Sequence, residues 1–320
     1  SSTLPTELDN SLYTVMSYDP VPAQAGIGDP AQQFPVTPML YDIQALQATY
    51  GANMSTRAGN TVYFSAGGEF AIANGGSLIA TIWDAGGVDT FSGAGQTSSV
   101  KIDLRPGHFS TIGSIADNIG IALGVEGTGA MSAWIENAIG GSAGDTLIGN
   151  ERANTLDGGA GDDVLWGDAG ADWMSGGAGD DTLDGGAGAD TANYGGATAG
   201  VTVNLGLTTA QNTGGAGVDT LHDMNNIAGS NYADSLIGDA GANTLIGNAG
   251  NDWLNGGAGA DWLDGGAGID TANYGWSTAG VTVNLGLATA QNTGGAGVDT
   301  LVSIENLVGS NYADSLIGDA

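Results

Sequence analysis

This 320-residue sequence contains no cysteine, 2 histidines and only 4 basic side chains. Without cysteine, neither disulfide bonds nor thiolate metal sites are available to stabilise the fold. All four Lys and Arg residues precede position 153, so residues 153–320 carry 21 carboxylates and no Lys or Arg. This charge balance argues against nucleic acids and anionic membranes as partners. We expect no transmembrane helix, because no apolar run is long enough for one, and we expect no signal peptide at Ser1.

Glycine, in contrast, is abundant, and much of it follows a nonapeptide template, GGxGxDxUx, in which U is apolar. Clear copies are GGAGDDVLW at 158–166, GGAGDDTLD at 176–184 and GGAGADWLD at 256–264. A longer repeat lies over the nonapeptides, because two similar segments open at Tyr194 and Tyr274. An ordinary glycine-rich linker is the alternative interpretation, but a linker does not require a strict phase with an apolar eighth position.

Each unit predicts a tight glycine turn followed by a short strand whose eighth residue points inward. One unit buries very little, so a core forms only when units stack, as in other solenoids. We therefore expect an all-β fold: blocks of right-handed parallel β-roll (β-solenoid) separated by spacers. The predicted inward residues are Leu147, Leu156, Leu165, Met174, Leu183, Leu236, Leu245, Leu254 and Leu263.

Two units per coil would align every second aspartate in one column, about 4.7 to 4.9 Å apart. Carboxylates stacked this closely repel each other unless a cation lies between them. Ca²⁺ suits such a site because it accepts six to eight oxygen ligands, including backbone carbonyls, whereas zinc prefers His or Cys. Asn154 and Asn243 replace aspartate in two units, so the number of ions stays open. The predicted calcium ligands are Asp145, Gly158, Asp163, Gly167, Asp172, Gly176, Asp181, Gly185, Asp190, Asp219, Asp234, Asp252, Gly256, Asp261, Gly265, Asp270, Asp299 and Asp314.

The part of the chain that precedes position 140 differs in composition and contains all seven prolines. Helical spacing of Leu40, Ile43, Leu46 and Tyr50 predicts a helix that Gly51 ends. Short β-like pieces follow at 61–64, 78–83 and 100–104. We expect one short helix ahead of an irregular β-rich connector.

Two further patterns have an ordinary explanation. GGSAG at 140–144 satisfies the GxSxG motif of hydrolases, but Ser142 lies at a variable turn position and no strand-to-helix pattern surrounds it. Four tryptophans, Trp166, Trp173, Trp253 and Trp262, fall at positions predicted to face outward. They either cover neighbouring turns or form a contact surface for self-association, sugar or a partner chain.

Several segments together resemble a known family. The nonapeptides resemble the calcium-binding repeats of RTX proteins. LYTVMSY at 12–18, TRAGNT at 56–61, IWDAGGVDTF at 82–91 and IENAIGGSAGD at 135–145 resemble the C-terminal portion of serralysin-type secreted zinc metalloproteases. The resemblance covers roughly residues 10–160 and implies secretion from bacteria, through a one-step channel, and calcium-driven folding outside the cell.

The resemblance also implies roles for individual residues. Met16 would match the Met-turn below a zinc site, and Tyr18 the tyrosine that approaches the metal. A further calcium site outside the nonapeptides would involve Arg57, Gly59, Thr61, Asp84, Gly86 and Asp89. The zinc-binding HExxH helix is missing, because His108 and His222 are far apart in the sequence and lack that context. No zinc and no catalysis are expected in this chain, and Ser1 is expected to follow the zinc helix of a parent protease.

The predicted domain organisation follows these segments. Residues 1–56 form a remnant of a metalloprotease-like domain, 57–139 a β-rich connector, 140–193 and 229–273 two β-roll blocks, 194–228 and 274–308 spacers, and 309–320 the start of a third block. The expected partners are calcium ions, a protease domain or the chain itself. Two alternative functions remain: a structural or adhesive extracellular protein that associates through solenoid ends or exposed Trp, and a carbohydrate-binding module like those of alginate epimerases. The lack of basic residues disfavours the latter for polyanions.

Overall fold

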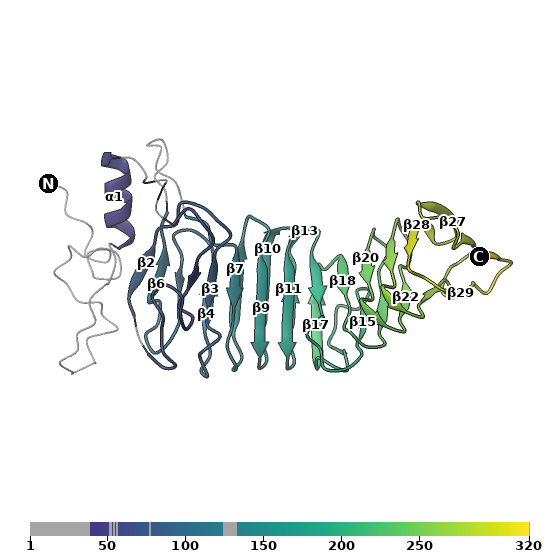
Figure 1. Ribbon diagram of the computed structural model, residues 1–320, viewed down its shortest axis with the longest axis horizontal. Coiled ribbons are helices and arrows are strands. Elements are labelled where there is room, and N and C mark those ends of the chain that lie inside the picture. The colour runs from purple at the N-terminus through teal and green to yellow at the C-terminus, as the bar shows by residue number, and fades with distance from the viewer. Residues whose placement is uncertain are drawn as a thin grey trace. The chain divides into compact units, whose positions relative to one another are not determined.

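The computed structural model describes residues 39–50, 53, 55, 57–76, 78–123 and 133–319, and the chain divides into two compact units at residues 151/152. Strands make up nearly all of the regular structure, and most of them pair in parallel (Figure 1). The predicted all-β class is confirmed. Within the described ranges, no helix has the length and apolar character needed to cross a membrane.

The N-terminal unit begins with the predicted helix. Helix α1 spans Leu40–Tyr50, and the Asp42 carboxylate accepts a hydrogen bond from the Met39 N–H at 3.0 Å, which caps the first turn. The strands that follow in this unit are β1 Val62–Tyr63, β2 Ala80–Ile82, β3 Thr90–Ser92, β4 Lys101–Asp103, β5 Phe109–Ser110, β6 Ile119–Ile121, β7 Asn137–Ile139 and β8 Thr146–Asn150. The three β-like pieces of the sequence therefore correspond to β1, β2 and β4.

The core of the N-terminal unit lies between short parallel pairs. Strand β3 pairs with both β1 and β7, β2 pairs with β6, and β4 pairs with β8. Tyr63, Phe64 and Phe91 are buried, and the Phe64 and Phe91 rings meet edge to face with centroids 5.0 Å apart. This aromatic cluster holds the two loops at 57–61 and 84–89 beside each other.

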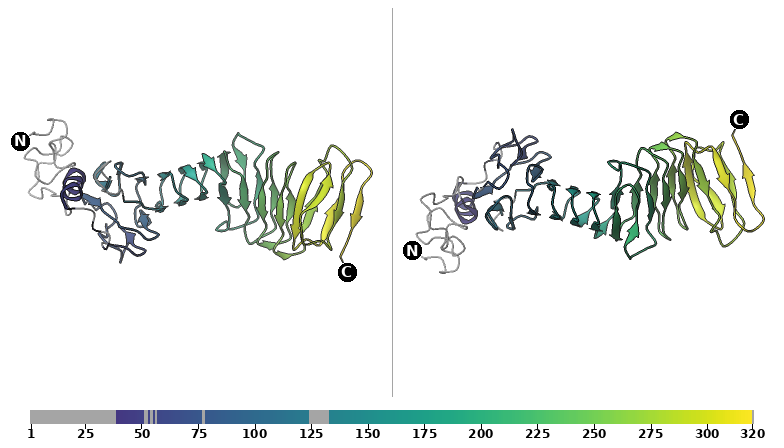
Figure 2. Two further views of the ribbon diagram at one scale, coloured as in Figure 1. Left: turned by 90° about the horizontal axis from the view of Figure 1, so that it is seen from above. Right: turned by 90° about the horizontal axis from the view of Figure 1, so that it is seen from below.

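The C-terminal unit consists of strands only, within the described part of the chain. They are β9 Thr155–Ala160, β10 Val164–Gly170, β11 Trp173–Ala178, β12 Thr182–Asp184, β13 Ala187–Gly188, β14 Thr191–Asn193, β15 Thr202–Asn204, β16 Gln211–Asn212, β17 Val218–His222, β18 Asn226–Ala228, β19 Ser235–Ile237, β20 Thr244–Ile246, β21 Ala249–Gly250, β22 Trp253–Asn255, β23 Trp262–Asp264, β24 Ala267–Gly268, β25 Thr271–Asn273, β26 Thr282–Asn284, β27 Gln291–Gly294, β28 Gly297–Val302, β29 Asn306–Val308 and β30 Ser315–Ile317. Figure 2 shows the later strands of this unit stacked side by side.

Two nonapeptides form each coil in the repeat blocks. Leu165 of β10 pairs with Leu183 of β12, and Leu156 of β9 pairs with Met174 of β11, so each register step spans two nonapeptides. The inward position 8 is confirmed, because all nine predicted core residues are at most 2% exposed. The four outward tryptophans are 39–46% exposed, as predicted.

The segments between the repeat blocks also belong to the solenoid. In the first segment, β17 pairs in parallel with β12 and β18 with β14, so both sheets of the preceding block continue. Strand β16 then covers β17 in an antiparallel pair, while β15 starts a new sheet with β19. The second segment repeats this exchange, because β27 covers β28 and β26 pairs with β30. Each long repeat therefore ends one sheet, continues a second and begins a third.

Candidate metal centres

A ladder of hydrogen bonds fixes one oxygen of each repeat aspartate. The backbone N–H of Asp163 donates to Asp181 Oδ1 at 2.9 Å, and that of Asp172 donates to Asp190 Oδ1 at 2.8 Å. In the second block, the N–H of Asp234 donates to Asp252 Oδ1 at 2.8 Å, again over two nonapeptides. The parallel register thus stacks the aspartates in columns, as the repeat phase predicted.

In six of the ladder aspartates the second oxygen is buried and has no hydrogen-bond donor among the described residues. This applies to Oδ2 of Asp172, Asp181, Asp190, Asp252, Asp261 and Asp270. Each of these residues is at most 3% exposed. A buried carboxylate oxygen without a donor is costly unless a cation or another partner compensates its charge. The position of these six oxygens therefore indicates cation sites.

Backbone carbonyls lie beside the same oxygens. A Cβ added at Gly167 would meet both Asp172 Oδ2 and the Gly185 carbonyl oxygen, the latter at 2.5 Å. A Cβ at Gly158 would likewise meet Asp163 Oδ2 and the Gly176 carbonyl oxygen. Glycine at position 1 of the repeat therefore leaves open a small space that is lined by a carboxylate of its own unit and a carbonyl of the next coil.

The carboxylate contact recurs at the other four predicted glycines, and the carbonyl contact at two of them. Gly176 lies against the Asp181 carboxylate and Gly256 against that of Asp261. Gly185 lies against Asp190 and the Asp223 carbonyl oxygen, and Gly265 against Asp270 and the Ser303 carbonyl oxygen. Carboxylate and carbonyl oxygens without imidazole or thiolate are the ligands that Ca²⁺ prefers. The donor set thus fits calcium better than it fits zinc.

Burial raises the pKa of the ladder carboxyl groups. It raises the pKa of Asp172, Asp181 and Asp252 to about 7, and that of Asp261 to about 6. In each case the N–H of the preceding coil opposes this effect, and neighbouring carboxylates add to it. Without a cation, the protein therefore disfavours the ionised form of these carboxyl groups. A bound cation would favour the ionised form and lower their pKa.

Other predicted ligands already have protein donors on both oxygens. Asp234 accepts hydrogen bonds from the N–H and Oγ of Ser230, both at 2.6 Å, and from the Val201 N–H at 2.7 Å. The Asp145 carboxylate accepts from the Val100 and Gly141 N–H groups.

Three more predicted ligands lie at the ends of their columns and also accept from protein groups. Asp219 accepts from the Thr213 hydroxyl at 3.0 Å and Asp299 from the Thr293 hydroxyl at 3.1 Å. Asp314 is exposed, and hydrogen bonds from Ser310 and from the Val281 N–H lower its pKa. The columns therefore contain aspartates whose second oxygen has a protein donor and aspartates whose second oxygen has none among the described residues. The nonapeptide pattern does not distinguish the two kinds.

The six residues implied by resemblance lie together in the N-terminal unit. The Thr61 N–H donates to Asp89 Oδ1 at 2.7 Å, and the Gly86 N–H donates to Asp84 Oδ1 at 3.0 Å. Asp89 is fully buried, its Oδ2 has no donor among the described residues, and burial raises its pKa to about 7. Gly59 contributes a carbonyl oxygen that accepts the Thr61 hydroxyl at 3.0 Å.

Arg57 lies at the edge of this cluster. It contacts Glu69 at 2.6 Å and the Trp83 carbonyl oxygen at 3.1 Å, so its guanidinium holds the two loops together. Met16 and Tyr18, the residues implied for a zinc site, lie outside the described residues.

Glutamates extend the aspartate columns, although the nonapeptide template did not predict them. Glu136 Oε2 accepts the Asp89 N–H at 3.0 Å, and Glu305 Oε2 accepts the Asp270 N–H at 2.8 Å. Both glutamates occur in the tripeptide Ile-Glu-Asn, at 135–137 and 304–306, so this repeated tripeptide was the available signal. Asn225 takes the equivalent position above Asp190, whose N–H it accepts at 2.9 Å.

The fold and the site together define a parallel β-solenoid with columns of buried carboxylates. Comparison with known proteins adds the family. The family described as "Peptidase M10 serralysin C terminal" matches residues 52–255, well over half of the chain. The chain belongs to this family.

Several serralysins and a related metalloprotease are similar to part of the chain. Serralysin of Photorhabdus laumondii subsp. laumondii is 44% identical over 157 residues, which cover 46% of this chain and 30% of the relative. Metalloprotease AprA of Pseudomonas entomophila is 42% identical over 155 residues, with 46% and 30% covered. Serralysin B of Dickeya chrysanthemi is 44% identical over 145 residues, with 44% and 28% covered. The chain thus spans less than a third of the length of each of these relatives.

Proposed function

We propose that this chain is a calcium-binding solenoid that folds when calcium binds. The ligands would be the six aspartates whose Oδ2 lacks a donor, together with Asp163 and the carbonyl oxygens that face the position-1 glycines. Bound calcium would neutralise the stacked carboxylates and link successive coils. Asp145, Asp219, Asp234, Asp299 and Asp314 would act mainly as ends of the columns, because protein groups already donate to them.

The N-terminal unit would hold a further calcium ion between its two loops. The ligands proposed there are the carboxylates of Asp84 and Asp89 and backbone oxygens at Arg57, Gly59, Thr61 and Gly86. Support comes from the buried Asp89 Oδ2 and from the close approach of Gly87 to the Gly59 carbonyl oxygen, which a Cβ at Gly87 would meet at 2.9 Å. Glu136 would stabilise the site through the Asp89 N–H.

Calcium binding of this kind is large enough to control folding. A site occupied only in the folded state, at a tenfold excess of calcium over its dissociation constant, adds about 1.4 kcal/mol. Six independent sites would add roughly 8 kcal/mol, which is comparable with the stability of a whole domain. Calcium modules that work outside the cell have dissociation constants of about 10⁻⁴ to 10⁻³ M. Such a chain would stay unfolded in a low-calcium cytosol and would fold after secretion.

We further propose that the chain forms the non-catalytic C-terminal region of a secreted bacterial zinc metalloprotease. The family assignment and the names of the relatives, serralysin and metalloprotease, support this proposal. The two histidines, His108 and His222, do not form an HExxH helix, so the chain would not supply a zinc site itself. The predicted division into a protease remnant, a connector, repeat blocks and spacers remains part of this proposal.

The six donor-free Oδ2 atoms are the observation that carries the calcium proposal. A calcium titration of the purified chain, followed by far-UV circular dichroism and hydrodynamic radius, tests it with magnesium as the control ion. We expect a cooperative compaction to β structure at about 0.1–1 mM calcium, with no comparable change in magnesium. A chain that is compact and β-rich in excess chelator would contradict calcium-driven folding.

A further inference from the structure

The outer surface of the C-terminal unit contains a groove of about 460 Å³ whose lining includes none of the column aspartates. It runs over β9, β11 and β14 and is closed on one side by residues 194–198 and 215–216. Its volume is within the range of about 300–1,000 Å³ that is usual for sites of small ligands. The lining side chains come from successive coils, so the register of the parallel strands decides which groups share the groove.

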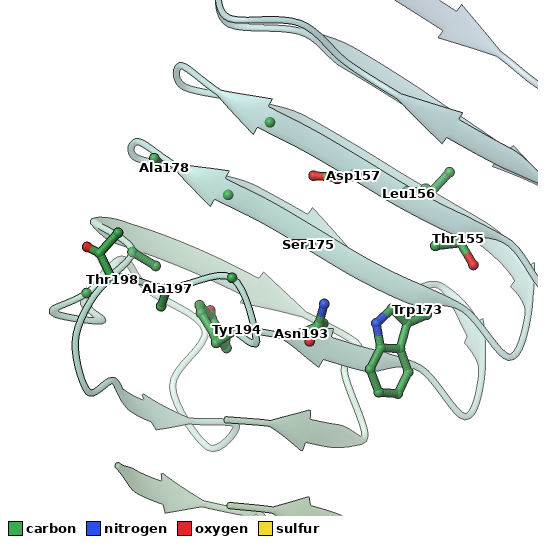
Figure 3. Close-up of a pocket in the computed structure, with 15 residues that line it drawn as sticks. Thr155, Leu156, Asp157, Trp173, Ser175, Ala178, Asn193, Tyr194, Ala197 and Thr198 are labelled. Atoms are coloured by element: carbon green, nitrogen blue, oxygen red, sulfur yellow. The ribbon is translucent and has the colours of Figure 1, made fainter. Parts of the chain in front are cut away.

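Two rows of side chains cross the three strands. Trp173 pairs with Thr155 on one side and Thr191 on the other, and Ser175 pairs with Asp157. In Figure 3, Asn193 lies between Trp173 and Tyr194, and Ala197 and Thr198 lie at the opposite end from Trp173. The groove therefore offers one indole and, next to it, a row with a carboxylate, a hydroxyl and a carboxamide.

These polar groups have free hydrogen-bonding capacity. Asn193 Oδ1 accepts the Gly195 N–H at 3.0 Å, which leaves Nδ2 as a donor. Ser175 and Asp157 are half-buried. Among the described residues no hydrogen bond involves the Ser175 hydroxyl. The backbone groups of β9 and β11, in contrast, are already used by the parallel ladder, so a ligand must bond to side chains rather than add a strand.

The ligand chemistry follows from this combination. A tryptophan face beside hydroxyl, amide and carboxylate groups suits the C–H face and the hydroxyl groups of a pyranose ring. The chain carries a formal net charge of −31 and no Lys or Arg after position 152, so an acidic sugar would be repelled. We propose that this groove binds a neutral oligosaccharide, with Trp173 stacking on one sugar ring and Asp157, Ser175 and Asn193 bonding to its hydroxyl groups.

The second long repeat supplies a natural comparison. At the equivalent positions Trp173 corresponds to Trp253 and Asn193 to Asn273, but Asp157 is replaced by Ile237 and Gly196 by Trp276. Trp253 is 41% exposed and Trp173 is 39% exposed, so the two indoles are matched in exposure. Of these two segments, only the first therefore combines the indole with a carboxylate and an open rim.

Two variants and one matched control separate binding from folding. Trp173→Ala removes the stacking surface, and Trp253→Ala is its matched control. Gly196→Trp places an indole at the rim of the groove, copying the residue that the second repeat carries at the same position. Nothing lies within 4 Å of a Cβ built at Gly196, so this change does not strain the turn.

The test is isothermal titration of the full chain, folded in calcium, with cellohexaose, maltohexaose and chitohexaose, and with a hexamer of polygalacturonate as the acidic control. We expect at least one neutral sugar to bind. Trp173→Ala and Gly196→Trp should each weaken that affinity about tenfold or more, equivalent to about 1.4 kcal/mol, and Trp253→Ala should leave it within about twofold. The calcium midpoint from circular dichroism should be the same for all variants, which separates failure of the groove from failure of calcium-driven folding.

Four results would each overturn the proposal. The first is that none of the three neutral sugars binds to the wild-type chain. The second is that Trp253→Ala weakens binding as much as Trp173→Ala, and the third is that Gly196→Trp leaves binding unchanged. Equal affinity for the polygalacturonate hexamer would also contradict it, because the charge argument excludes acidic ligands.

Discussion

Replacing Asp252 by Asn tests the proposed calcium ladder most directly, because the effect should change sign with calcium. Asp252 is 2% exposed, its Oδ2 has no donor among the described residues, and a Cβ at Gly247 would meet that oxygen and the Gly265 carbonyl. Burial is the main cause that raises its pKa from 3.8 to about 7. Without metal at pH 8, the folded chain must therefore hold this carboxylate ionised at a cost.

The magnitude of this cost follows from the pKa. The rise corresponds to at most about 4 kcal/mol, and solvent screening reduces it to on the order of 2 kcal/mol. The substituted carboxamide would carry no charge, and the structure already contains an asparagine in such a place: Asn243 Nδ2 donates to the Asn225 carbonyl at 2.7 Å. We expect Asp252→Asn to stabilise the fold by on the order of 2 kcal/mol at limiting low calcium. The unfolding free energy should also rise less steeply with calcium. For each ion lost, the slope should fall by about 1.4 kcal/mol per tenfold increase in calcium concentration.

Urea unfolding at calcium concentrations from about 0.1 to about 10 mM measures both effects. The slope of unfolding free energy against the logarithm of calcium counts the ions, and the lines of variant and wild type should cross. Asp264→Asn is the matched control, because it removes the same charge from a half-buried side chain outside the ladder. An unchanged slope for Asp252→Asn, or a variant that is less stable at every calcium concentration, would refute the reasoning.

Three further predictions concern the same columns and the core. Three ladder carboxyls have a pKa of about 7, so the metal-free fold should lose stability as pH rises from about 4 to about 7. Calcium affinity should fall as pH drops from 8 to 5, because protons then compete with calcium for these carboxylates. A calcium midpoint that is independent of pH would contradict this prediction. Leu245→Ala should cost about 2–5 kcal/mol in saturating calcium, since Leu245 is fully buried, and a loss below about 1 kcal/mol in urea unfolding would indicate a loosely packed core. Gly158→Ala should reduce the number of bound calcium ions, because its Cβ would meet the Asp163 carboxylate and the Gly176 carbonyl, whereas Gly196→Ala should leave it unchanged in equilibrium dialysis.

Sequence alone determined the repeating part of this protein. A strict nonapeptide phase fixes which side chains face inward, because strand residues alternate and only position 8 is consistently apolar. Leu156 and Leu165 were therefore predictable as core, and Trp173 and Trp262 as outward-facing. The alignment of aspartates in columns followed from the same phase. The helix at Leu40–Tyr50 was also predictable, because its apolar spacing is local.

Only the tertiary structure decided which aspartates have a free oxygen. Asp234 and Asp252 occupy the same position of the template, but the Ser230 N–H donates to Oδ2 of the first, whereas no donor among the described residues reaches Oδ2 of the second. Ser230 lies only four residues before Asp234, but contacts in the folded turn decide whether its N–H reaches Oδ2. The roles of Glu136 and Glu305, and the groove beside Trp173, have the same origin. The sequence period sets what each coil contains, whereas contacts between coils and the segments that join them determine how each polar group is satisfied.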